Sequence, residues 1–233
     1  SGGAITDSGT QAITGDATFT NTAGSDDAIT LDDASNAFSG TVTFATDSGS
    51  AVTIVDTTAL DLVALTAASL SATAGGAVTD SGTLAIAGAT TISASEQDIT
   101  LDESASTFGT LALTGANVAV TDAGAVDLGA STVSGTLGIT SAGAVTDSGT
   151  LAITGATTIS ASGQDITLDQ AASTFGTLAL TGANVAVTEN AATDLGASTI
   201  SGTFGITSGG AITDSGTQAI TGDATFTNTA GDD

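Results

Sequence analysis

The chain has 233 residues, and it contains 25 acidic residues but no Lys, Arg, His, Cys, Met, Trp, Tyr or Pro. A formal charge of −25 excludes ion pairs between its side chains, and it disfavours nucleic acid and anionic membranes as partners because phosphate recognition relies on Lys and Arg. Without His, Cys or Lys the chain also lacks the residues for a Ser–His–Asp triad, a zinc site or a Lys-dependent phosphate loop. We expect no enzyme activity.

The hydrophobic residues indicate an ordered β structure rather than an acidic disordered chain. They make up 40 % of the sequence and are mostly Val, Ile, Leu and Ala, which alternate with Thr, Ser and Ala as in half-buried strands. Long-chain helix formers are scarce, and no apolar run is long enough to span a bilayer. The clearest alternating segments are residues 99–101, 111–113, 118–120 and 137–139.

The strands belong to long sequence repeats. The segment Gly-Ala-Val-Thr-Asp-Ser-Gly-Thr-Leu begins at Gly76 and recurs at Gly143, 67 residues later, and related copies begin at Gly3 and Gly210. Self-similarity at a fixed period is the signature of solenoids and other repeat architectures. The chain therefore divides into the repeats 3–75, 76–142 and 143–209 and the partial repeat 210–233.

A second periodicity lies above this one, because residues 1–24 are identical to residues 208–231. We therefore expect one continuous solenoid that is a window of a longer tandem array. Each 67-residue repeat is long enough for about three turns of a parallel β-helix, with turns at 76–97, 98–117 and 118–142. Tandem β-sandwich modules are the alternative, but a sandwich needs about 100 residues and usually large core aromatics.

Glycine-containing segments mark the corners between strands. Asp-Ser-Gly, Thr-Gly-Ala-Asn and Leu-Gly-Ala-Ser recur there, and Gly or Asn would supply a positive φ at low cost. Phe38, Phe108 and Phe175 occupy matching positions before a Gly-Thr strand. They would form either an exposed aromatic platform for a sugar or base, or an interior filler. We favour the interior filler because the neighbouring strand is apolar.

Aspartates also recur in step with the repeat. Catalysis by stacked acids would need a second group of different pKa or a nearby cation, and the sequence motifs of calcium β-rolls and EF-hands are absent. We favour Asx turns, in which each side chain caps its own backbone. The weak candidates for Ca²⁺ ligands are Asp80, Asp102, Asp127, Asp147, Asp169 and Asp194.

The density of charge suggests a collective role for cations. The repeat 76–142 contains seven acids, which over three turns gives about one charge per 2 Å of axis, near the linear density of duplex DNA. No discrete cofactor is expected. A diffuse atmosphere of Na⁺, Mg²⁺ or Ca²⁺ would let neighbouring filaments approach one another.

The chain resembles the repeat region of filamentous-haemagglutinin-type giant bacterial surface proteins. Gly-Ala-Val-Thr-Asp-Ser-Gly-Thr-Leu-Ala-Ile-Thr-Gly at 143–155 and Val-Asp-Leu-Gly-Ala-Ser-Thr-Val-Ser-Gly-Thr-Leu at 126–137 carry this resemblance, which covers essentially the whole chain. It implies a right-handed parallel β-helix, two-partner-type secretion, an extracellular or cell-surface location, and a role as an adhesin stalk or matrix fibre. It transfers no functional residue.

Two functions remain open at this point. The first is a structural filament, such as a surface fibre or a biofilm component. The second is an adhesin stalk whose lateral faces bind carbohydrate or a host surface. Open strand edges at the ends of a solenoid favour self-association, so we expect end-to-end or lateral assembly, without nucleic acid or membrane insertion.

Overall fold

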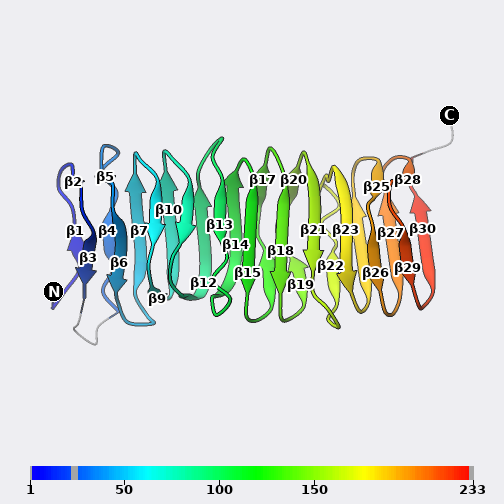
Figure 1. Ribbon diagram of the computed structural model, residues 1–233, viewed down its shortest axis with the longest axis horizontal. Helices are drawn as coiled ribbons and strands as arrows, with labels where there is room; N and C mark the ends of the chain where they lie inside the picture. The colour runs from blue at the N-terminus through cyan, green and yellow to red at the C-terminus, as the bar shows by residue number, and fades with distance from the viewer. Residues whose placement is uncertain (1, 22–25, 231–233) are drawn as a thin grey trace.

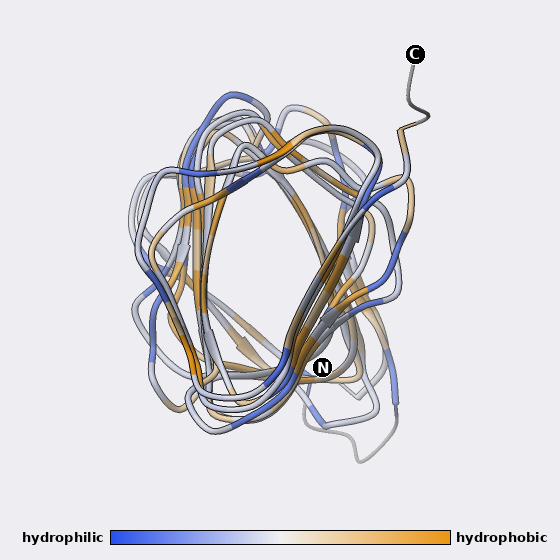
Figure 2. Cartoon of the chain, turned by 90° about the vertical axis from the view of Figure 1, so that its right-hand side faces the viewer, coloured by the Kyte–Doolittle hydropathy of each residue, from blue (hydrophilic) through white to orange (hydrophobic). Residues whose placement is uncertain are grey.

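The computed structural model describes residues 2–21 and 26–230, which form one elongated rod of stacked strands (Figure 1). The strand pairs are parallel, and the described residues contain no helix, hence none that could cross a membrane. Viewed along its axis, the chain coils around one common interior (Figure 2). The predicted all-β parallel β-solenoid is confirmed.

Two broad sheets and one strand pair contain all the named strands. The first broad sheet has 15 strands: β1 (Ile5–Thr6), β4 (Ile29–Leu31), β7 (Ala51–Asp56), β9 (Leu65–Ala67), β10 (Ser69–Ala74), β12 (Leu84–Ser93), β14 (Thr107–Gly115), β16 (Val126–Leu128), β17 (Ser131–Val133), β19 (Val145–Asp147), β20 (Leu151–Ile153), β22 (Ile166–Leu168), β24 (Val185–Glu189), β27 (Phe204–Ser208) and β30 (Ala224–Asn228). The second broad sheet has 13 strands: β3 (Ala17–Thr20), β6 (Thr41–Ala45), β8 (Leu60–Leu62), β11 (Val78–Asp80), β13 (Ile99–Leu101), β15 (Val118–Asp122), β18 (Leu137–Ser141), β21 (Ala156–Ser160), β23 (Thr177–Gly182), β25 (Thr193–Leu195), β26 (Ser198–Ile200), β28 (Ile212–Asp214) and β29 (Gln218–Ile220). The separate pair consists of β2 (Ala12–Ile13) and β5 (Ala37–Phe38).

The chain alternates between the two broad sheets as it coils. The main path of the first sheet runs through twelve strands from β1 to β30, and that of the second through eleven strands from β3 to β28. The short strands β9, β17, β20, β26 and β29 lie off these paths, beside the corners. The coil therefore has about eleven and a half turns, and it starts and finishes in the first broad sheet.

The sequence repeat corresponds to three and a half turns, slightly more than the expected three. Strands β11, β19 and β28 carry the same Val/Ile-Thr-Asp sequence, yet β11 and β28 lie in the second sheet and β19 lies in the first. Seven steps along the second sheet lead from β11 to β28, which are two repeats apart. Each repeat therefore presents its residues on the opposite side of the rod from the repeat before it.

The register explains where the extra half turn lies. Val78 pairs with Ile99, and Ile99 pairs with Val118, so the predicted turns 76–97 and 98–117 match the structure. Val118 already pairs with Leu137, which means that the predicted turn 118–142 contains the start of another turn.

Alternation in the sequence places one apolar set inside the rod. The ladder of Val78, Ile99, Val118 and Leu137 is buried, with at most 2 % of each residue exposed. Parallel strands bring such residues about 4.8 Å apart, and their burial removes them from water along the whole rod. The three repeated phenylalanines, Phe38, Phe108 and Phe175, are also buried, so the interior position predicted for them is confirmed.

The conformation predicted for the corner glycines was wrong. Among the described residues, φ is positive only at Glu96 and Gly163, and neither belongs to the corner segments named from the sequence. Glycine is needed at those corners because the neighbouring turn passes very close. A Cβ atom on Gly82 would overlap the carbonyl oxygen of Val63, and one on Gly149 would overlap the backbone of Ala130.

Candidate functional site

The most regular polar feature of the rod is a carboxylate at the end of the Thr-Asp strands. At the end of β11, Asp80 Oδ1 accepts the backbone N–H of Asp102 from the next turn at 2.8 Å. Its Oδ2 accepts the hydroxyl of Ser106 at 3.4 Å, and Ser106 Oγ accepts the N–H of Leu84 at 3.0 Å. Asp80 and Ser106 thereby fix the corner loop after β13 onto the preceding turn.

We call this arrangement, in which a carboxylate at a strand end holds the corner loop of the next turn, a clamp. The next repeat forms the same clamp on the opposite side of the rod. Asp147, at the end of β19, accepts the N–H groups of Asp169 at 2.7 Å and Gln170 at 3.4 Å. Ser173 Oγ accepts the N–H of Leu151 at 3.0 Å. The two clamps are related by the 67-residue offset, so the sequence repeat is also a repeat of hydrogen bonds.

The first repeat uses an amide in place of the serine. Asp7 accepts the N–H of Asp32 at 3.1 Å and that of Asp33 at 3.3 Å, as well as Asn36 Nδ2 at 2.6 Å. Asn36 Oδ1 accepts the N–H of Gln11 at 2.7 Å. Asn36 thus takes the place that Ser106 and Ser173 have in the later repeats, three or four positions after the residues whose N–H groups the aspartate accepts.

A second carboxylate holds each of these loops from the other side. Asp122 Oδ2, from the turn after the loop, accepts the N–H of Phe108 at 2.9 Å. Glu189 Oε2 accepts the N–H of Phe175 at 3.2 Å, and Asp56 Oδ1 accepts the N–H of Phe38 at 3.1 Å. Each corner loop with its buried phenylalanine therefore lies between an acid of the turn before and an acid of the turn after.

These contacts correct the expectation that the Thr-Asp-Ser-Gly aspartates cap their own backbone. Asp80 and Asp147 mainly accept N–H groups from the next turn. The Asx turn is made instead by Asp122, whose Oδ1 accepts the N–H of Gly124 at 2.6 Å, and by Asp56 with the N–H of Thr58 at 2.9 Å. The distinction matters because a bond between turns resists their separation.

The clamps carry charge that is partly removed from water. Burial raises the pKa of Asp80, Asp122 and Asp147, and backbone N–H donors oppose this rise. Burial also raises the pKa of Glu189, against the effect of Thr193 and the Phe175 N–H. The Asn36 amide lowers the pKa of Asp7.

A third set of acids lies on the lateral surface among hydroxyl groups. Asp127 Oδ2 accepts the hydroxyls of Thr110 at 3.0 Å and Ser148 at 2.7 Å. Asp194, one repeat later, accepts those of Thr177 at 3.0 Å and Ser215 at 2.8 Å. These bonds connect three successive turns on the outside of the rod.

The structure separates the six weak calcium candidates into two kinds of place. Asp102 and Asp169 are exposed and lie beside the clamp residues Asp80 and Asp147, whereas Asp127 and Asp194 lie on the hydroxyl-lined lateral surfaces. Within 2–21 and 26–230, no group of three or more acidic side chains is arranged to hold a metal ion. The carboxylates of Asp80, Asp127, Asp147 and Asp194 have protein donors as partners.

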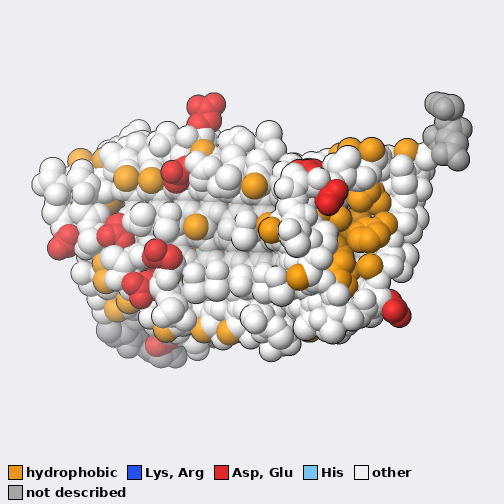
Figure 3. All heavy atoms as spheres, turned by 45° about the vertical axis from the view of Figure 1, so that its right-hand side comes forward, with side chains coloured by type: hydrophobic (Ala, Val, Ile, Leu, Met, Phe, Trp, Pro, Cys, Tyr) orange, Lys and Arg blue, Asp and Glu red, His pale blue; other side chains and the backbone are white. Residues whose placement is uncertain are grey.

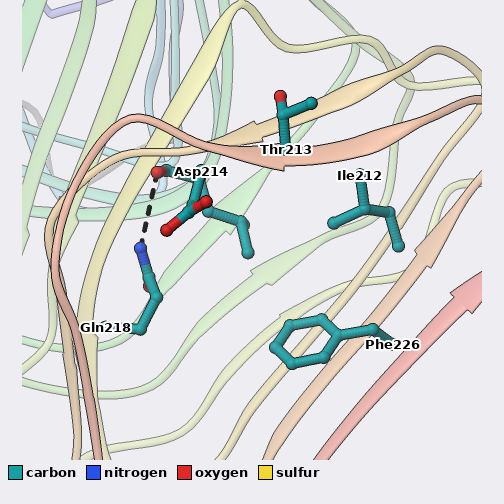
Figure 4. A pocket seen from close by; sticks show the side chains of 6 residues that line it. Ile212, Thr213, Asp214, Gln218 and Phe226 are labelled. Carbon is teal, nitrogen blue, oxygen red and sulfur yellow. Dashed lines mark hydrogen bonds between the residues drawn. The ribbon is translucent and has the colours of Figure 1, made fainter.

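A hollow of about 240 Å³ opens at the C-terminal end of the rod. Figure 4 shows Phe226 and Ile212 on one side of it and Asp214 and Gln218 on the other. Gln218 Nε2 donates to the carbonyl oxygen of Gly196 at 2.7 Å. Figure 3 shows hydrophobic side chains gathered at this end, while acidic side chains are scattered along the rest of the visible face.

Sequence reasoning did not single out the buried acids Asp56, Asp122 and Glu189. A signal was present for two of them, because residue 122 and residue 189 are one repeat apart and both are acidic although one is Asp and the other Glu. The two repeats keep a carboxylate at this position although the side chain is longer in Glu189 than in Asp122, which suggests that the carboxylate has a fixed role. The partner N–H of the phenylalanine becomes evident only when the turns are stacked.

Comparison with known proteins places the same periodicity in a wider group. The DUF5649 family, described as repeats of unknown function, matches residues 1–45, 49–114, 115–181 and 182–233. No curated protein and no solved structure matches the chain. The family segments cover nearly every residue, and the two internal ones, 49–114 and 115–181, have the length of the 67-residue repeat to within one residue. The chain therefore belongs to the DUF5649 family of repeats of unknown function.

Proposed function

We propose that this chain is a structural element of an extracellular filament or surface fibre, and that it acts as a stiff spacer without catalysis. The observation that carries this proposal is the continuity of the solenoid. One buried apolar interior and two broad parallel sheets run through all the turns, without a break between sequence repeats.

The repeat converts sequence length into distance in fixed steps. Three and a half turns at about 4.8 Å per turn give about 17 Å of axis for each 67-residue repeat. Because neighbouring turns share both sheet hydrogen bonds and carboxylate clamps, bending the rod would require several of these bonds to lengthen together. Such a unit suits a role in which distance and stiffness are needed.

The chemistry of the acids supports a structural role over a catalytic one. Asp80, Asp122 and Asp147 each accept N–H groups from the backbone of the rod, so their lone pairs already hold corners in place. Acid–base catalysis would require a second group of different proton affinity in reach of a substrate. The chain has no His, Lys or Cys for that purpose.

The location outside a bacterial cell belongs to the same proposal and rests on the resemblance of the repeats to filamentous-haemagglutinin-type surface proteins. A polyanionic rod without cationic side chains also suits an environment rich in dissolved cations, which would screen its charge. Sodium, magnesium or calcium would act here as a diffuse atmosphere.

A length series tests the spacer function. Chains with residues 76–142 duplicated once or twice keep natural junctions, because residue 142 is followed by the same motif in the native sequence. Each duplication should lengthen the rod by about 17 Å in small-angle X-ray scattering and electron microscopy, with unchanged circular dichroism per residue. A 67-residue Gly/Ser insertion at the same junction is the control, and it should produce a flexible joint instead.

Two results would contradict the proposal. If duplications gave separate globular modules or no regular gain in length, the chain would not be a continuous spacer. If the rod lengthened as expected but bound defined glycans on an array through its lateral faces, the adhesin alternative would replace the purely structural role.

A further inference from the structure

The corner between β24 and β25 differs from the equivalent corner of the preceding repeat at two buried positions. Glu189 and Thr193 stand where the preceding repeat has Asp122 and Val126, and all four residues lie inside the rod. The longer acid is therefore accompanied by a hydroxyl, and the shorter acid by an apolar side chain. This joint change allows the chemistry of the two corners to be compared within one scaffold.

At the earlier corner both carboxylate oxygens have backbone donors. Asp122 Oδ2 accepts the N–H of Phe108 at 2.9 Å, and its Oδ1 accepts the N–H of Gly124 at 2.6 Å. Backbone N–H groups can only donate, so a proton on either oxygen of Asp122 would replace one of these bonds. The neutral form of Asp122 therefore loses a hydrogen bond that the ionised form keeps.

At the later corner one carboxylate oxygen has no donor. Glu189 Oε2 accepts the N–H of Phe175 at 3.2 Å. Glu189 Oε1 and Thr193 Oγ1 are both shielded from solvent and have no hydrogen-bond partner among the described residues, and the two residues are only 2 % and 1 % exposed. A buried charged oxygen without a donor is costly, so the ionised form of Glu189 is poorly satisfied at this corner.

The two unpartnered groups lie close together, because the Thr193 hydroxyl affects the pKa of Glu189. A protonated Oε1 is a donor, and a hydroxyl oxygen can accept, so a single proton satisfies both groups. The earlier corner cannot do this, since Val126 has no hydroxyl. In the first repeat, Asp56 also has one oxygen without a partner, but the strand after its corner begins with Leu60.

Other charges do not determine the affinity of this corner for a proton. Burial is the largest influence on the pKa of Glu189 and raises it, against the smaller effects of its two hydrogen-bonding neighbours. The acids of the surrounding elements do not contribute to this shift. Asp169 in the loop below and Asp214 in β28 above are exposed, Asp194 accepts hydroxyls on the lateral surface, and Asp147 holds the far side of the loop. The chain has no cationic side chain that could favour the ionised form.

We propose that Glu189 and Thr193 form a proton-binding site inside the rod, and that loss of this proton loosens the corner between β24 and β25. With the proton taken up from solvent, Glu189 Oε1 donates to Thr193 Oγ1 while Oε2 still accepts the N–H of Phe175. Without the proton, a charge with too few donors remains buried and the loop before β23 is held less firmly. The inference deepens the proposed spacer function, because it specifies a corner at which the rod loosens as pH rises.

Carbon NMR of the glutamate carboxyl groups tests the proton site directly. The chain has only three glutamates, Glu96, Glu103 and Glu189, so protein containing ¹³C-labelled glutamate gives three carboxyl signals. The signal that disappears in Glu189→Gln is that of Glu189, and in the native chain it should titrate at a higher pH than the other two. Three coincident titrations would overturn the inference.

Hydrogen exchange at corrected intrinsic rates tests the loosening. The N–H groups of Phe175 and Phe108 have equivalent places and are each held by one carboxylate oxygen. At pH 7.5 the protection factor of the Phe175 N–H should be lower by about fivefold or more, which is the lower end of the cost of an unsatisfied buried polar atom. At pH 4, near the ordinary pKa of glutamate, the difference should shrink because the proton is bound.

Three variants separate the proton site from other differences between the repeats. Glu189→Gln carries a permanent donor and no charge, so it should keep the Phe175 N–H protected at both pH values. The double variant Glu189→Asp/Thr193→Val introduces the residues of the preceding repeat and should remove the dependence on pH. Glu96→Gln deletes the same charge from an exposed side chain and should leave the native difference unchanged.

Equal protection of Phe175 and Phe108 at both pH values in the native chain would overturn the inference, as would a Glu189→Gln variant that behaves like the native chain. Either result would leave the expected gain of about 17 Å per added repeat unaffected, and with it the spacer function. Loss of that length relationship would contradict the spacer function itself, whatever the protonation state of Glu189.

Discussion

Glu96 and Gly163 occupy the same place in successive repeats and share a left-handed backbone conformation, with φ of 63° and 75°. Each is the third residue of a turn closed by a 2.9 Å hydrogen bond, from the N–H of Gln97 to Ala94 in one repeat and from the N–H of Gln164 to Ala161 in the other. Glycine adopts this conformation without steric cost, whereas a side chain such as that of Glu96 does not.

Replacement of Glu96 by glycine should stabilise the rod. Relief of the left-handed strain outweighs the added freedom of glycine in the unfolded chain, for a net gain of about 0.5–1 kcal/mol in the free energy of unfolding. Denaturant unfolding followed by circular dichroism measures this difference. Glu96→Gln removes the same charge but keeps the strain, so it should have little effect. Gly163→Glu should lower the free energy of unfolding by about as much as Glu96→Gly raises it. Equal stability of all three variants would show that the left-handed conformation carries no strain.

Close approach between turns makes a different glycine irreplaceable. A Cβ atom on Gly149 would overlap the backbone of Ala130 in the preceding turn, so Gly149→Ala should push the turns apart and cost about 1–3 kcal/mol. Gly138 in β18 also lies inside the rod, but its added Cβ would be 3.8 Å from the carbonyl oxygen of Val118, which is an ordinary van der Waals contact. Gly138→Ala should therefore change the free energy of unfolding very little. Similar losses for both alanine variants would show that backbone conformation, and not the approach of the turns, requires the glycine.

A buried hydroxyl identifies a position where the interior can be improved. Thr157 is fully buried between Leu137 and Leu178, with which it is paired in register, and its Oγ1 has no hydrogen-bond partner among the described residues. Valine keeps the branched shape and removes the unsatisfied polar group, so Thr157→Val should stabilise the rod by about 1–3 kcal/mol. The exposed neighbour Thr158 provides the control, since Thr158→Val should have little effect. A neutral or destabilising Thr157→Val would imply that the hydroxyl has a partner, such as an ordered water.

The sequence was sufficient to predict the class of fold and the main corners. Each repeat has alternating apolar residues that it cannot bury alone, and stacking on the neighbouring repeats buries them. A solenoid is the simplest fold that stacks repeats in this way. The buried places of Phe38, Phe108 and Phe175 followed from the apolar strands beside them. The Asp-Ser-Gly corners were also located correctly, although the physical reason for their glycines was not.

The half-turn relationship between repeats was not available from the sequence. A period of 67 residues gives the length of a repeat but not the number of residues in a turn, and that number varies within the rod. Leu178 pairs with Leu195, 17 positions later, whereas Val78 pairs with Ile99, 21 positions later. The buried acids were missed for a related reason. An acid near a strand end resembles a surface residue until the next turn places an unpaired N–H beside it.

The clamp carboxylates make stability depend on pH in an unusual direction. Four of them, Asp80, Asp122, Asp147 and Glu189, have a pKa raised by burial. A folded state with raised pKa values binds protons more readily than the unfolded state, so its stability is greatest below the ordinary pKa values and falls as pH rises through the raised ones. The pKa of Asp7 is lowered by Asn36, so Asp7 makes stability rise with pH. It is one group, whereas four groups have the opposite effect.

The rod should therefore melt at a higher temperature at pH 4, near the ordinary pKa values of Asp and Glu, than at pH 7.5, by a few degrees, as followed by circular dichroism at constant ionic strength. Asp122→Asn tests the cause, because it removes one of the four buried acids and should flatten the dependence on pH, whatever its effect on absolute stability. Glu96→Gln removes the same formal charge from an exposed side chain and should flatten it less, since general repulsion among the 25 acids changes equally in both variants. If the two variants flattened the dependence equally, repulsion over the whole rod, and not the buried clamps, would be its origin. If native stability rose with pH instead, the clamps would be more stable charged than neutral, and the backbone N–H donors would outweigh the cost of burial.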